Sequence, residues 1–255
     1  MSAICFNNLN LTLGTKTILE NVSSNIKAGE FTILLGPNGT GKSSLLKLIS
    51  REWKTKGEVA YFEKSLKDWK PSQLAKHLGI LPQHSNLTFA FSAREVVELG
   101  GLNLVASQQD IEAIAAKNMA ITDVSHLAER IFPSLSGGEK QRIHLARVLT
   151  QIEQSGEQRA LLLDEPTSAL DLGHQHKTLS LARKMAKQGA AVVAVIHDLN
   201  LAAQYGDRLV LLNGGHVVAD GKPDEVLTPE IVNAVYQWQV NVIPHPTAGY
   251  PVIIS

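Results

Sequence analysis

The alternation of apolar and polar residues predicts strands near the start of the chain. Every second residue from 9 to 13 is leucine, and the residues between them are polar. A period of two is typical of a strand that buries one of its faces. Further strand signals cover 22–26, 31–35 and 58–62, and 31–35 is an apolar run. We therefore expect the start of the chain to be rich in β structure.

Two apolar runs further along lack this alternation. Residues 161–163 are all leucine, and 191–196 read Ala-Val-Val-Ala-Val-Ile. Uninterrupted runs are expected of strands that are covered on both faces in a parallel sheet. After them, the turn Asn-Gly-Gly at 213–215 separates two strand patterns, which predicts a hairpin. Pro223 and Pro229 each predict the first turn of a short helix.

The middle of the chain, from about 83 to 154, has a helical pattern. Before it, Pro71 predicts the start of a short helix that Gly79 ends. Residues 92–95 (Ser-Ala-Arg-Glu) have the composition of a capping box ahead of an apolar run. Residues 107–119 predict a second helix. Along the chain, a β-rich part is thus followed by a helical part and then by an α/β part.

The stretch 36–43 reads Gly-Pro-Asn-Gly-Thr-Gly-Lys-Ser and follows a predicted strand. Its glycines let backbone N–H groups surround phosphate oxygens, and the helix that follows adds a partial positive charge. Lys42 would reach the terminal phosphates, and Ser43 would bind Mg²⁺. A glycine-rich turn without a ligand would leave this Lys-Ser pair unexplained. The predicted nucleotide-binding residues of this stretch are Gly36, Pro37, Asn38, Gly39, Thr40, Gly41, Lys42, Ser43 and Ser44.

Two acids, Asp164 and Glu165, directly follow the apolar run 161–163. A buried strand that ends in two acids suits one carboxylate that holds Mg²⁺ and another that polarises an attacking water. We assign Asp164 to the metal and Glu165 to the catalytic base. Such acids alone are more often helix caps or solvent-facing groups, but the phosphate loop in the same chain favours catalysis.

The stretch 135–142 reads Leu-Ser-Gly-Gly-Glu-Lys-Gln-Arg. Ser136 and Glu139 predict the capped start of a helix. Two glycines in a first turn are a poor choice for helix stability, at about 1 kcal/mol each relative to alanine. Gly137 and Gly138 do leave bare backbone at a positive helix end, which a phosphate can approach closely.

This stretch resembles the LSGGQ signature of ATP-binding-cassette ATPases, and the other motifs of that family stand in order along the chain. They are the Walker A loop 36–43, the Q-loop residue Gln83, the Walker B strand ending at Asp164, the D-loop 168–171 and the switch residue His197. The resemblance implies an α/β fold with a P-loop NTPase core, an antiparallel β sub-domain and a helical sub-domain. It implies one domain over 1–255, in which 1–83 and 155–255 form the core and 84–154 the helical sub-domain.

The resemblance also implies roles for these residues. Two such domains pair head to tail, so the 136–138 segment would act on ATP held by a second copy. His197 would contact the γ-phosphate and orient the attacking water beside Glu165. The implied Mg²⁺ ligands are Ser43, Gln83 and Asp164. One departure is that many family members place an aromatic ring under adenine where this chain has Leu13.

The chain also resembles the ATP-binding subunits of importers for hemin, siderophores and cobalamin, and those for hemin most. This resemblance rests on residues 78–85, 168–176 and 197–205 and on the tail around 245–246. The resemblance implies ATP hydrolysis coupled to hemin uptake through a separate transmembrane permease dimer. A periplasmic hemin-binding protein would be an indirect partner. A ferric siderophore or cobalamin remains the alternative cargo. The implied location is peripheral, at the cytoplasmic face of the bacterial inner membrane.

Residues 84–94 are candidate contacts for a permease, and they include Phe89 and Phe91. Both rings could equally fill the core of the helical sub-domain. His174 and His176 are two residues apart on a predicted helix and therefore lie on different faces, which argues against a shared metal. We expect solvated histidines rather than a haem or metal site.

Composition excludes some classes of protein. The 24 Lys and Arg residues balance the 24 Asp and Glu residues, so the formal net charge gives no support for a nucleic-acid partner. The single cysteine, Cys5, excludes an intramolecular disulfide and a Cys-rich metal site. We see neither a signal peptide nor a run of about 18 apolar residues, and expect a soluble, cytoplasmic protein.

Two other functions would also use a phosphate loop. A soluble cassette ATPase of the translation or repair kind usually joins two cassettes or adds long extensions, and neither feature occurs here. A small-molecule P-loop kinase would leave residues 135–139 and His197 unexplained. Both are less favoured than an import ATPase.

Overall fold

In a computed structural model of the chain, which describes residues 2–83, 87 and 89–255, strand β3 (Phe31–Leu35) is buried along its whole length. Strands β8 (Ala191–Val195) and β9 (Arg208–Asn213) pair with it in parallel. Strand β10 (His216–Gly221) pairs with β9 in the antiparallel sense. All five residues of β8 are buried as well. This confirms that the uninterrupted apolar run 191–196 contains a strand covered on both faces.

The chain divides into two compact units. Unit 1 holds residues 1–68 and 179–255, and unit 2 holds residues 69–178. Helix α6 (Leu172–Lys187) runs across the boundary in sequence. The expected division into a core of 1–83 and 155–255 and a helical part of 84–154 has different limits and stays a prediction.

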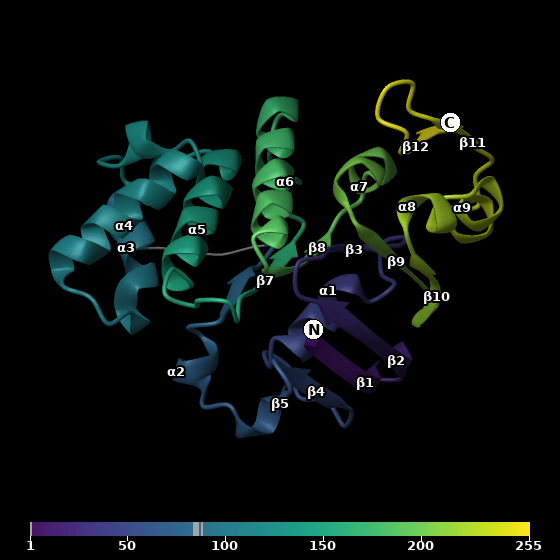
Figure 1. Cartoon of the computed structure of the whole chain (residues 1–255), viewed down its shortest axis with the longest axis horizontal. Helices are drawn as coiled ribbons and strands as arrows, with labels where there is room; N and C mark the ends of the chain where they lie inside the picture. The colour runs from purple at the N-terminus through teal and green to yellow at the C-terminus, as the bar shows by residue number, and fades with distance from the viewer. Residues whose placement is uncertain (1, 84–86, 88) are drawn as a thin grey trace. The chain divides into compact units, whose positions relative to one another are not determined.

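A second sheet in unit 1 is antiparallel, with the order β2-β1-β4-β5 (Figure 1). Its strands are β1 (Ser2–Leu13), β2 (Lys16–Lys27), β4 (Glu58–Tyr61) and β5 (Lys64–Ser65). Burial along β1 declines towards the hairpin tip, because Leu9 is fully buried whereas Leu13 is 48% exposed. The alternation of leucines therefore predicted the strand correctly but overstated how far its apolar face is covered.

The remaining elements of unit 1 are mostly short helices. They are α1 (Lys42–Ile49), the 3₁₀ turn η1 (Leu66–Asp68), α7 (Leu199–Tyr205), α8 (Pro223–Val226) and α9 (Pro229–Tyr236). A hairpin of β11 (Asn241–Pro244) and β12 (Pro251–Ile254) follows them. The predicted β9–β10 turn is confirmed, since Gly214 and Gly215 both have positive φ angles, of 55° and 86°.

Unit 2 is mainly helical, with the parallel pair β6 (Leu78–Leu81) and β7 (Ala160–Asp164). Its helices are α2 (Pro71–Leu74), α3 (Ala93–Glu98), α4 (Gln108–Ile121) and α5 (Gly137–Gln151), with 3₁₀ turns η2 (Leu99–Asn103), η3 (Ser125–Leu127) and η4 (Phe132–Ser134). Residues of α3, α4 and α5 share one apolar core, which includes Val96, Met119, Phe132 and Ile143.

Gly79 corrects one prediction. It does not end the helix that starts at Pro71, because that helix ends at Leu74 and Gly79 lies in β6. A Cβ atom on Gly79 would stand 2.7 Å from the side chain of Val148 on α5. The glycine is thus a packing position, where helix α5 lies close to the strand.

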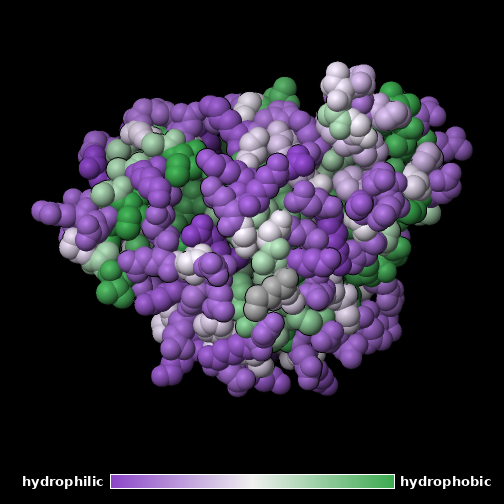
Figure 2. Space-filling model, in the orientation of Figure 1, coloured by the Kyte–Doolittle hydropathy of each residue, from purple (hydrophilic) through white to green (hydrophobic). Residues whose placement is uncertain are grey.

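No helix among the described residues is both long enough and apolar enough to cross a bilayer. The face of the molecule in Figure 2 is mostly covered by hydrophilic residues, and apolar surface is visible over unit 2. Leu102 and Val105 are among the large apolar side chains of that unit that are exposed.

Candidate nucleotide site

The phosphate loop predicted at 36–43 connects the buried strand β3 to helix α1. Gly36 has a φ angle of 141°, and a Cβ atom there would lie 2.1 Å from the carbonyl oxygen of Leu212. Gly41 caps α1 in the left-handed conformation, and a Cβ atom there would lie 2.7 Å from Leu19. Both positions therefore require glycine, because any side chain would collide with a neighbouring strand.

Lys42 is buried within its own loop, with only 5% of its surface exposed. Its Nζ donates hydrogen bonds of 2.8 Å to the carbonyl oxygens of both Gly36 and Pro37. The Thr40 hydroxyl also donates to the Pro37 carbonyl, at 2.9 Å. A buried ammonium needs such partners. The arrangement holds a positive charge at the start of α1, where a phosphate group would bind.

His197 lies at the same edge of the sheet as the phosphate loop. Strands β3 and β8 run parallel, and the Ile196 N–H still donates to the Leu34 carbonyl oxygen, at 3.3 Å. Since parallel strands end at one edge, the residues that follow them, Gly36 and His197, both lie there. The histidine is exposed. Within unit 1 the structure thus brings together two of the predicted motifs.

The residue after the switch histidine starts a helix. The Asp198 carboxylate accepts from the backbone N–H groups of Asn200 and Leu201, at 2.8 and 2.9 Å, and so caps α7. An N-cap of this kind fixes where the helix begins. It therefore also constrains the backbone of His197, which directly precedes it. This role of Asp198 was not predicted, although an Asp ahead of an apolar helix is a usual capping signal.

In unit 2, the two predicted acids occupy the end of β7. Asp164 is 7% exposed, and Glu165 is half-buried with a φ angle of 51°. A positive φ at a non-glycine residue is uncommon and is typical of functional sites. The Glu165 carbonyl oxygen accepts from Gln141 Nε2 at 2.9 Å and from the Ser168 hydroxyl at 3.1 Å. Gln141 was not singled out from the sequence.

Gln83 follows β6, the parallel neighbour of β7. Leu81 is paired with Leu163, so the two strands end side by side. Gln83 is exposed and lies two residues past this pair, at the edge where Asp164 and Glu165 also follow. Within unit 2 the structure thus places the Q-loop glutamine and both acids at one edge, as their positions after parallel strands predict.

The signature segment forms the start of helix α5. Ser136 is its N-cap, and a reciprocal capping box with Glu139 is present, as predicted. The Ser136 N–H and hydroxyl both donate to the Glu139 carboxylate at 2.8 Å. These two hydrogen bonds lower the pKa of Glu139 below its ordinary value.

Gly138 has a second reason to lack a side chain. A Cβ atom there would lie 2.7 Å from the carbonyl oxygen of Ala169, in the D-loop segment. At Gly137 the nearest atom, the Ala169 Cβ, would be 3.7 Å away, an ordinary contact. The prediction from sequence concerned only a phosphate that approaches the helix end. In the structure, Gly138 also lets the D-loop pack against that first turn.

A group of charges joins the start of α6 to the end of α4. The His174 ring nitrogen Nδ1 bonds to the Asp171 carboxylate at 2.9 Å, and its Nε2 is 3.6 Å from Asp123. Lys177 Nζ donates to Asp123 at 2.7 Å, and Arg142 donates to the Asp123 carbonyl oxygen at 2.7 Å. The bonds from Lys177 lower the pKa of Asp123. Those from His174 lower the pKa of Asp171.

These contacts change the interpretation of the histidines. His174 is half-buried between two carboxylates, so the expectation of a solvated side chain is wrong for it. His176 is half-buried as well. In the part of the chain that the structure describes, no group of three His, Cys, Asp or Glu side chains is arranged to hold a metal ion.

The candidate permease contacts fall partly outside the described residues. Positions 84–86 and 88, which include His84 and Ser85, lie outside them. Phe89 is 70% exposed. Phe91 packs against the apolar core of unit 2. The two rings therefore differ. Phe89 lies at the surface, where a partner could contact it, whereas Phe91 helps to fill the core.

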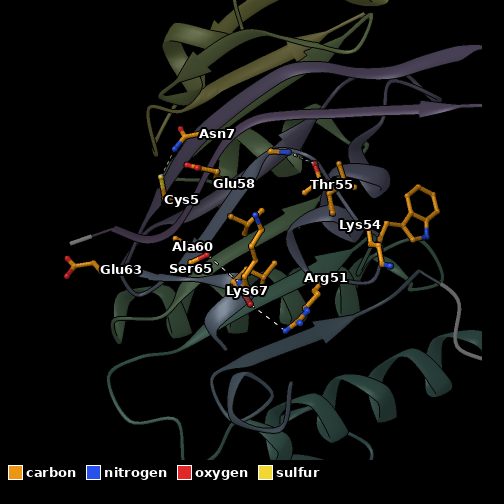
Figure 3. A pocket seen from close by; sticks show the side chains of 15 residues that line it. Cys5, Asn7, Arg51, Lys54, Thr55, Glu58, Ala60, Glu63, Ser65 and Lys67 are labelled. Carbon is orange, nitrogen blue, oxygen red and sulfur yellow. Dashed lines mark hydrogen bonds between the residues drawn. The ribbon is translucent and has the colours of Figure 1, made fainter. Parts of the chain in front are cut away.

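A cavity of about 520 Å³ lies elsewhere in unit 1 (Figure 3). Its lining includes Cys5, Arg51, Trp53, Lys54 and Lys67, and none of its described lining residues is a predicted site residue. Arg51 Nη1 donates to the Leu66 carbonyl oxygen at 3.4 Å, and a dashed line at the labelled Arg51 marks this bond in Figure 3. The cavity is thus separate from the nucleotide motifs.

Comparisons with known proteins agree with this set of motifs. Residues 19–168 match the family model described as ABC transporter. The Hemin import ATP-binding protein HmuV of Photobacterium profundum is 56% identical over 253 residues, covering 99% of this chain and 91% of the relative. The protein of the same name from Vibrio cholerae is 53% identical, with 98% of this chain and 97% of the relative covered.

Solved structures show the same fold. One, described as an inward-facing conformation of a metal-chelate type ABC transporter, has a TM-score of 0.81 at 26% identity, covering 99% of this chain and 96% of its own. Another is a dimeric, post-hydrolysis state of an ATP-binding cassette bound to ADP and Pi, with a TM-score of 0.74 at 30% identity, covering 86% and 98%. The fold predicted from the sequence is confirmed. The chain belongs to the ABC transporter family and carries its ATP-binding domain.

Proposed function

We propose that this chain is the ATP-hydrolysing subunit of a hemin importer and that it works with a separate membrane permease. The observation that carries this proposal is the likeness to relatives named as hemin import ATP-binding proteins. They are 53% to 56% identical over 96% to 99% of this chain. This likeness extends over nearly the whole chain and therefore well beyond residues 19–168, the part that matches the family model.

The phosphate loop would hold the ATP phosphates. Its fit to a phosphate chain is supported by the glycine positions that admit no side chain and by the buried ammonium of Lys42. Ser43, Gln83 and Asp164 offer hydroxyl, amide and carboxylate oxygens, which are the ligands that Mg²⁺ prefers. When bound, Mg²⁺ would neutralise developing charge on the phosphates.

Hydrolysis would need residues from two copies of the chain. Glu165 would accept a proton from the attacking water, and His197 would hold that water near the γ-phosphate. The Ser136 hydroxyl and the bare backbone of Gly137 and Gly138 would face the ATP held by the other copy. Pairing of two copies is supported by the dimeric structure of a related ATP-binding cassette, and the head-to-tail arrangement is what the resemblance to the family implies.

The permease would bind the helical part of the chain. Phe89 is exposed and lies in the segment that follows Gln83, so its ring is the contact we favour. Binding there would place the chain at the cytoplasmic face of the bacterial inner membrane, as a peripheral subunit. A periplasmic hemin-binding protein would deliver the cargo to the other side of the permease.

Cargo identity is tested by reconstitution of the chain with candidate permeases in lipid vesicles. Hemin, cobalamin and a ferric siderophore are offered in turn, and both ATP hydrolysis and uptake are measured. We expect hemin to stimulate both, and the Glu165→Gln variant to lose both. Stimulation by cobalamin or the siderophore alone would assign the other cargo. Co-purification with ribosomes or DNA instead of a permease would favour a cassette ATPase that is not a transporter.

A further inference from the structure

The cavity in unit 1 lies at an open edge of the antiparallel sheet. Strand β5 pairs with the last two residues of β4, Ala60 and Tyr61. The first two, Glu58 and Val59, lie outside this pairing and line the cavity. The edge of a strand presents backbone N–H and C=O groups that no neighbouring strand uses. The cavity can therefore offer a ligand backbone groups as well as side chains.

Hydrogen bonds between elements hold the walls of the cavity in place. The fully buried Tyr61 donates from its hydroxyl to the carbonyl oxygen of Ile49, at 3.0 Å, and so joins β4 to the end of α1. Arg51, just after α1, donates to the carbonyl oxygen of Leu66 in η1, and both of these residues line the cavity. Because the walls are bonded to one another without a ligand, binding would order little of the chain.

Part of the lining suits a ligand with an apolar or aromatic body. The large apolar residues of the lining are Leu48, Trp53, Val59 and Leu66. The Trp53 indole is half-buried, and the ammonium of Lys47 lies 4.8 Å from its ring centroid. The volume of the cavity, about 520 Å³, is within the range of about 300–1,000 Å³ that is usual for small-molecule sites.

Three cationic side chains also line the cavity, and they are Arg51, Lys54 and Lys67. Among the residues that the structure describes, no acidic side chain forms an ion pair with Lys54 or Lys67. Arg51 is held by its bond to a carbonyl oxygen, and a guanidinium has further N–H donors in a fixed plane. Such a set of donors can bind a carboxylate or a sulfonate.

Two acids, Glu58 and Glu63, are the other charged groups of the lining. Figure 3 shows Glu63 at the left of the view and Arg51 and Lys54 towards the right, so this acid lies apart from those two cations. The cations also outnumber the acids. An anionic group placed among the cations is therefore favoured over a cationic one.

We propose that this cavity binds a small organic anion with an aromatic or apolar body. The anionic group would lie among Arg51, Lys54 and Lys67, and the body would lie against Trp53 and Leu48. None of the described lining residues belongs to the nucleotide motifs, so this ligand and ATP would bind at the same time. The inference does not depend on the proposed hydrolysis or on the proposed cargo.

The test uses two fluorescent probes that differ by one anionic group. Anilinonaphthalene sulfonate carries a sulfonate, and phenylnaphthylamine has the same rings without it. Fluorescence titration of the full chain gives the Kd of each probe, and thermal unfolding checks the fold of each variant. We expect the sulfonate probe to bind more tightly and its affinity to fall as salt is added, because salt screens exposed charges. Saturating ADP with Mg²⁺ should not displace it.

A double variant tests the charges. Lys54→Met with Lys67→Met should weaken binding of the sulfonate probe about fivefold, as the loss of two exposed ionic contacts would, and change that of the neutral probe by less than about twofold. Lys184→Met with Lys187→Met is the matched control. It removes two exposed lysines from α6 in the same unit and should change neither affinity.

A second variant tests the cavity itself. Ala60→Leu adds three carbons to a lining residue and should weaken binding of both probes about tenfold or more, because it fills the space that the rings would occupy. Ala219→Leu is its control, since Ala219 is a half-buried strand residue of unit 1 outside the lining.

The outcomes decide between this site and others. Displacement of the sulfonate probe by ADP would place it in the nucleotide site and overturn the proposal. Equal effects of the Lys54 and Lys67 changes on both probes, or no effect on either, would overturn the preference for an anion. A folded Ala60→Leu variant that binds both probes as wild type does would show that they bind elsewhere. If that variant does not fold, the lysine variants still decide, because they change only exposed side chains.

Discussion

The side chain of Gln141 donates a hydrogen bond of 2.9 Å to the carbonyl oxygen of Glu165. Gln141 lies in the second turn of the signature helix α5, and Glu165 directly follows β7. Because Glu165 has a positive φ angle, its backbone needs support from neighbouring groups. One helix thus both presents the signature glycines and holds the backbone of the proposed catalytic base.

We predict that Gln141→Ala lowers kcat for ATP several-fold, because the Glu165 backbone relaxes, and that it costs about 1 kcal/mol of stability. Gln151→Ala is the matched control. Gln151 is on the same helix and donates to the carbonyl oxygens of Ala75 and Leu78, away from Glu165. For both variants, kcat is measured by steady-state kinetics and the free energy of unfolding by denaturant titration. Equal losses of kcat would show that Glu165 is not specifically supported.

Glu165→Gln should retain ATP binding and lose turnover by a factor of about 100 or more, since the amide cannot accept the proton from water. Single-turnover hydrolysis and equilibrium ATP binding are the measurements. Near-wild-type hydrolysis would remove Glu165 from the role of base.

Lys42→Ala should weaken ATP binding about tenfold or more, because a charge-assisted contact to phosphate is lost. Titration calorimetry measures the change. Lys47→Ala, a partly exposed lysine on the same helix, serves as control. Unchanged affinity in the Lys42 variant would contradict the assignment of the phosphate loop.

Gly138→Ala should reduce the free energy of unfolding by about 1–3 kcal/mol, because the new methyl group would lie 2.7 Å from the Ala169 carbonyl oxygen. Gly137→Ala meets only an ordinary contact and adds a better helix former, so its stability should be unchanged or raised. Chemical denaturation of the pair tests this. Similar stabilities would mean that Gly138 is not a packing position.

Acid should weaken the link between Asp123 and Lys177. The pKa of Asp123 is lowered in the folded chain, so its stabilising effect is complete above the unfolded value of about 3.9 and is lost as pH falls through the lower folded value. Asp123→Asn and Lys177→Met should therefore both flatten the dependence of unfolding free energy on pH below about 4. An unchanged slope in both variants would refute the pairing.

Local patterns predicted much of the fold. The apolar runs 31–35 and 191–196 form buried strands, and the Asn-Gly-Gly turn forms its hairpin, because each depends on residues adjacent in sequence. The capping boxes at Ser92 and Ser136 are present for the same reason. A motif made of consecutive residues, such as the phosphate loop, also lies between a strand and a helix, as the sequence pattern predicted.

Contacts between distant segments could not be predicted in this way. Gly79 was assigned to a helix end because nothing in its neighbours indicates that α5 packs against it. His174 pairs with Asp123, which is 51 positions away, and the contact of Gln141 with Glu165 likewise needs the fold. The two hydrogen bonds between Asn200 and Ile253 likewise join distant segments, and the C-terminal hairpin carries no recognised motif.

The hydrogen bonds from Lys42 to two backbone carbonyl oxygens affect the free energy of phosphate binding. An ammonium has three N–H donors, and the carbonyl oxygens of Gly36 and Pro37 each accept one. A free lysine side chain carries about 2 kcal/mol of rotamer entropy, which a flexible phosphate-binding lysine would lose when its ligand arrives. Here that loss is incurred when the chain folds. The lysine is preorganised, so the affinity for phosphate is not reduced by ordering its side chain.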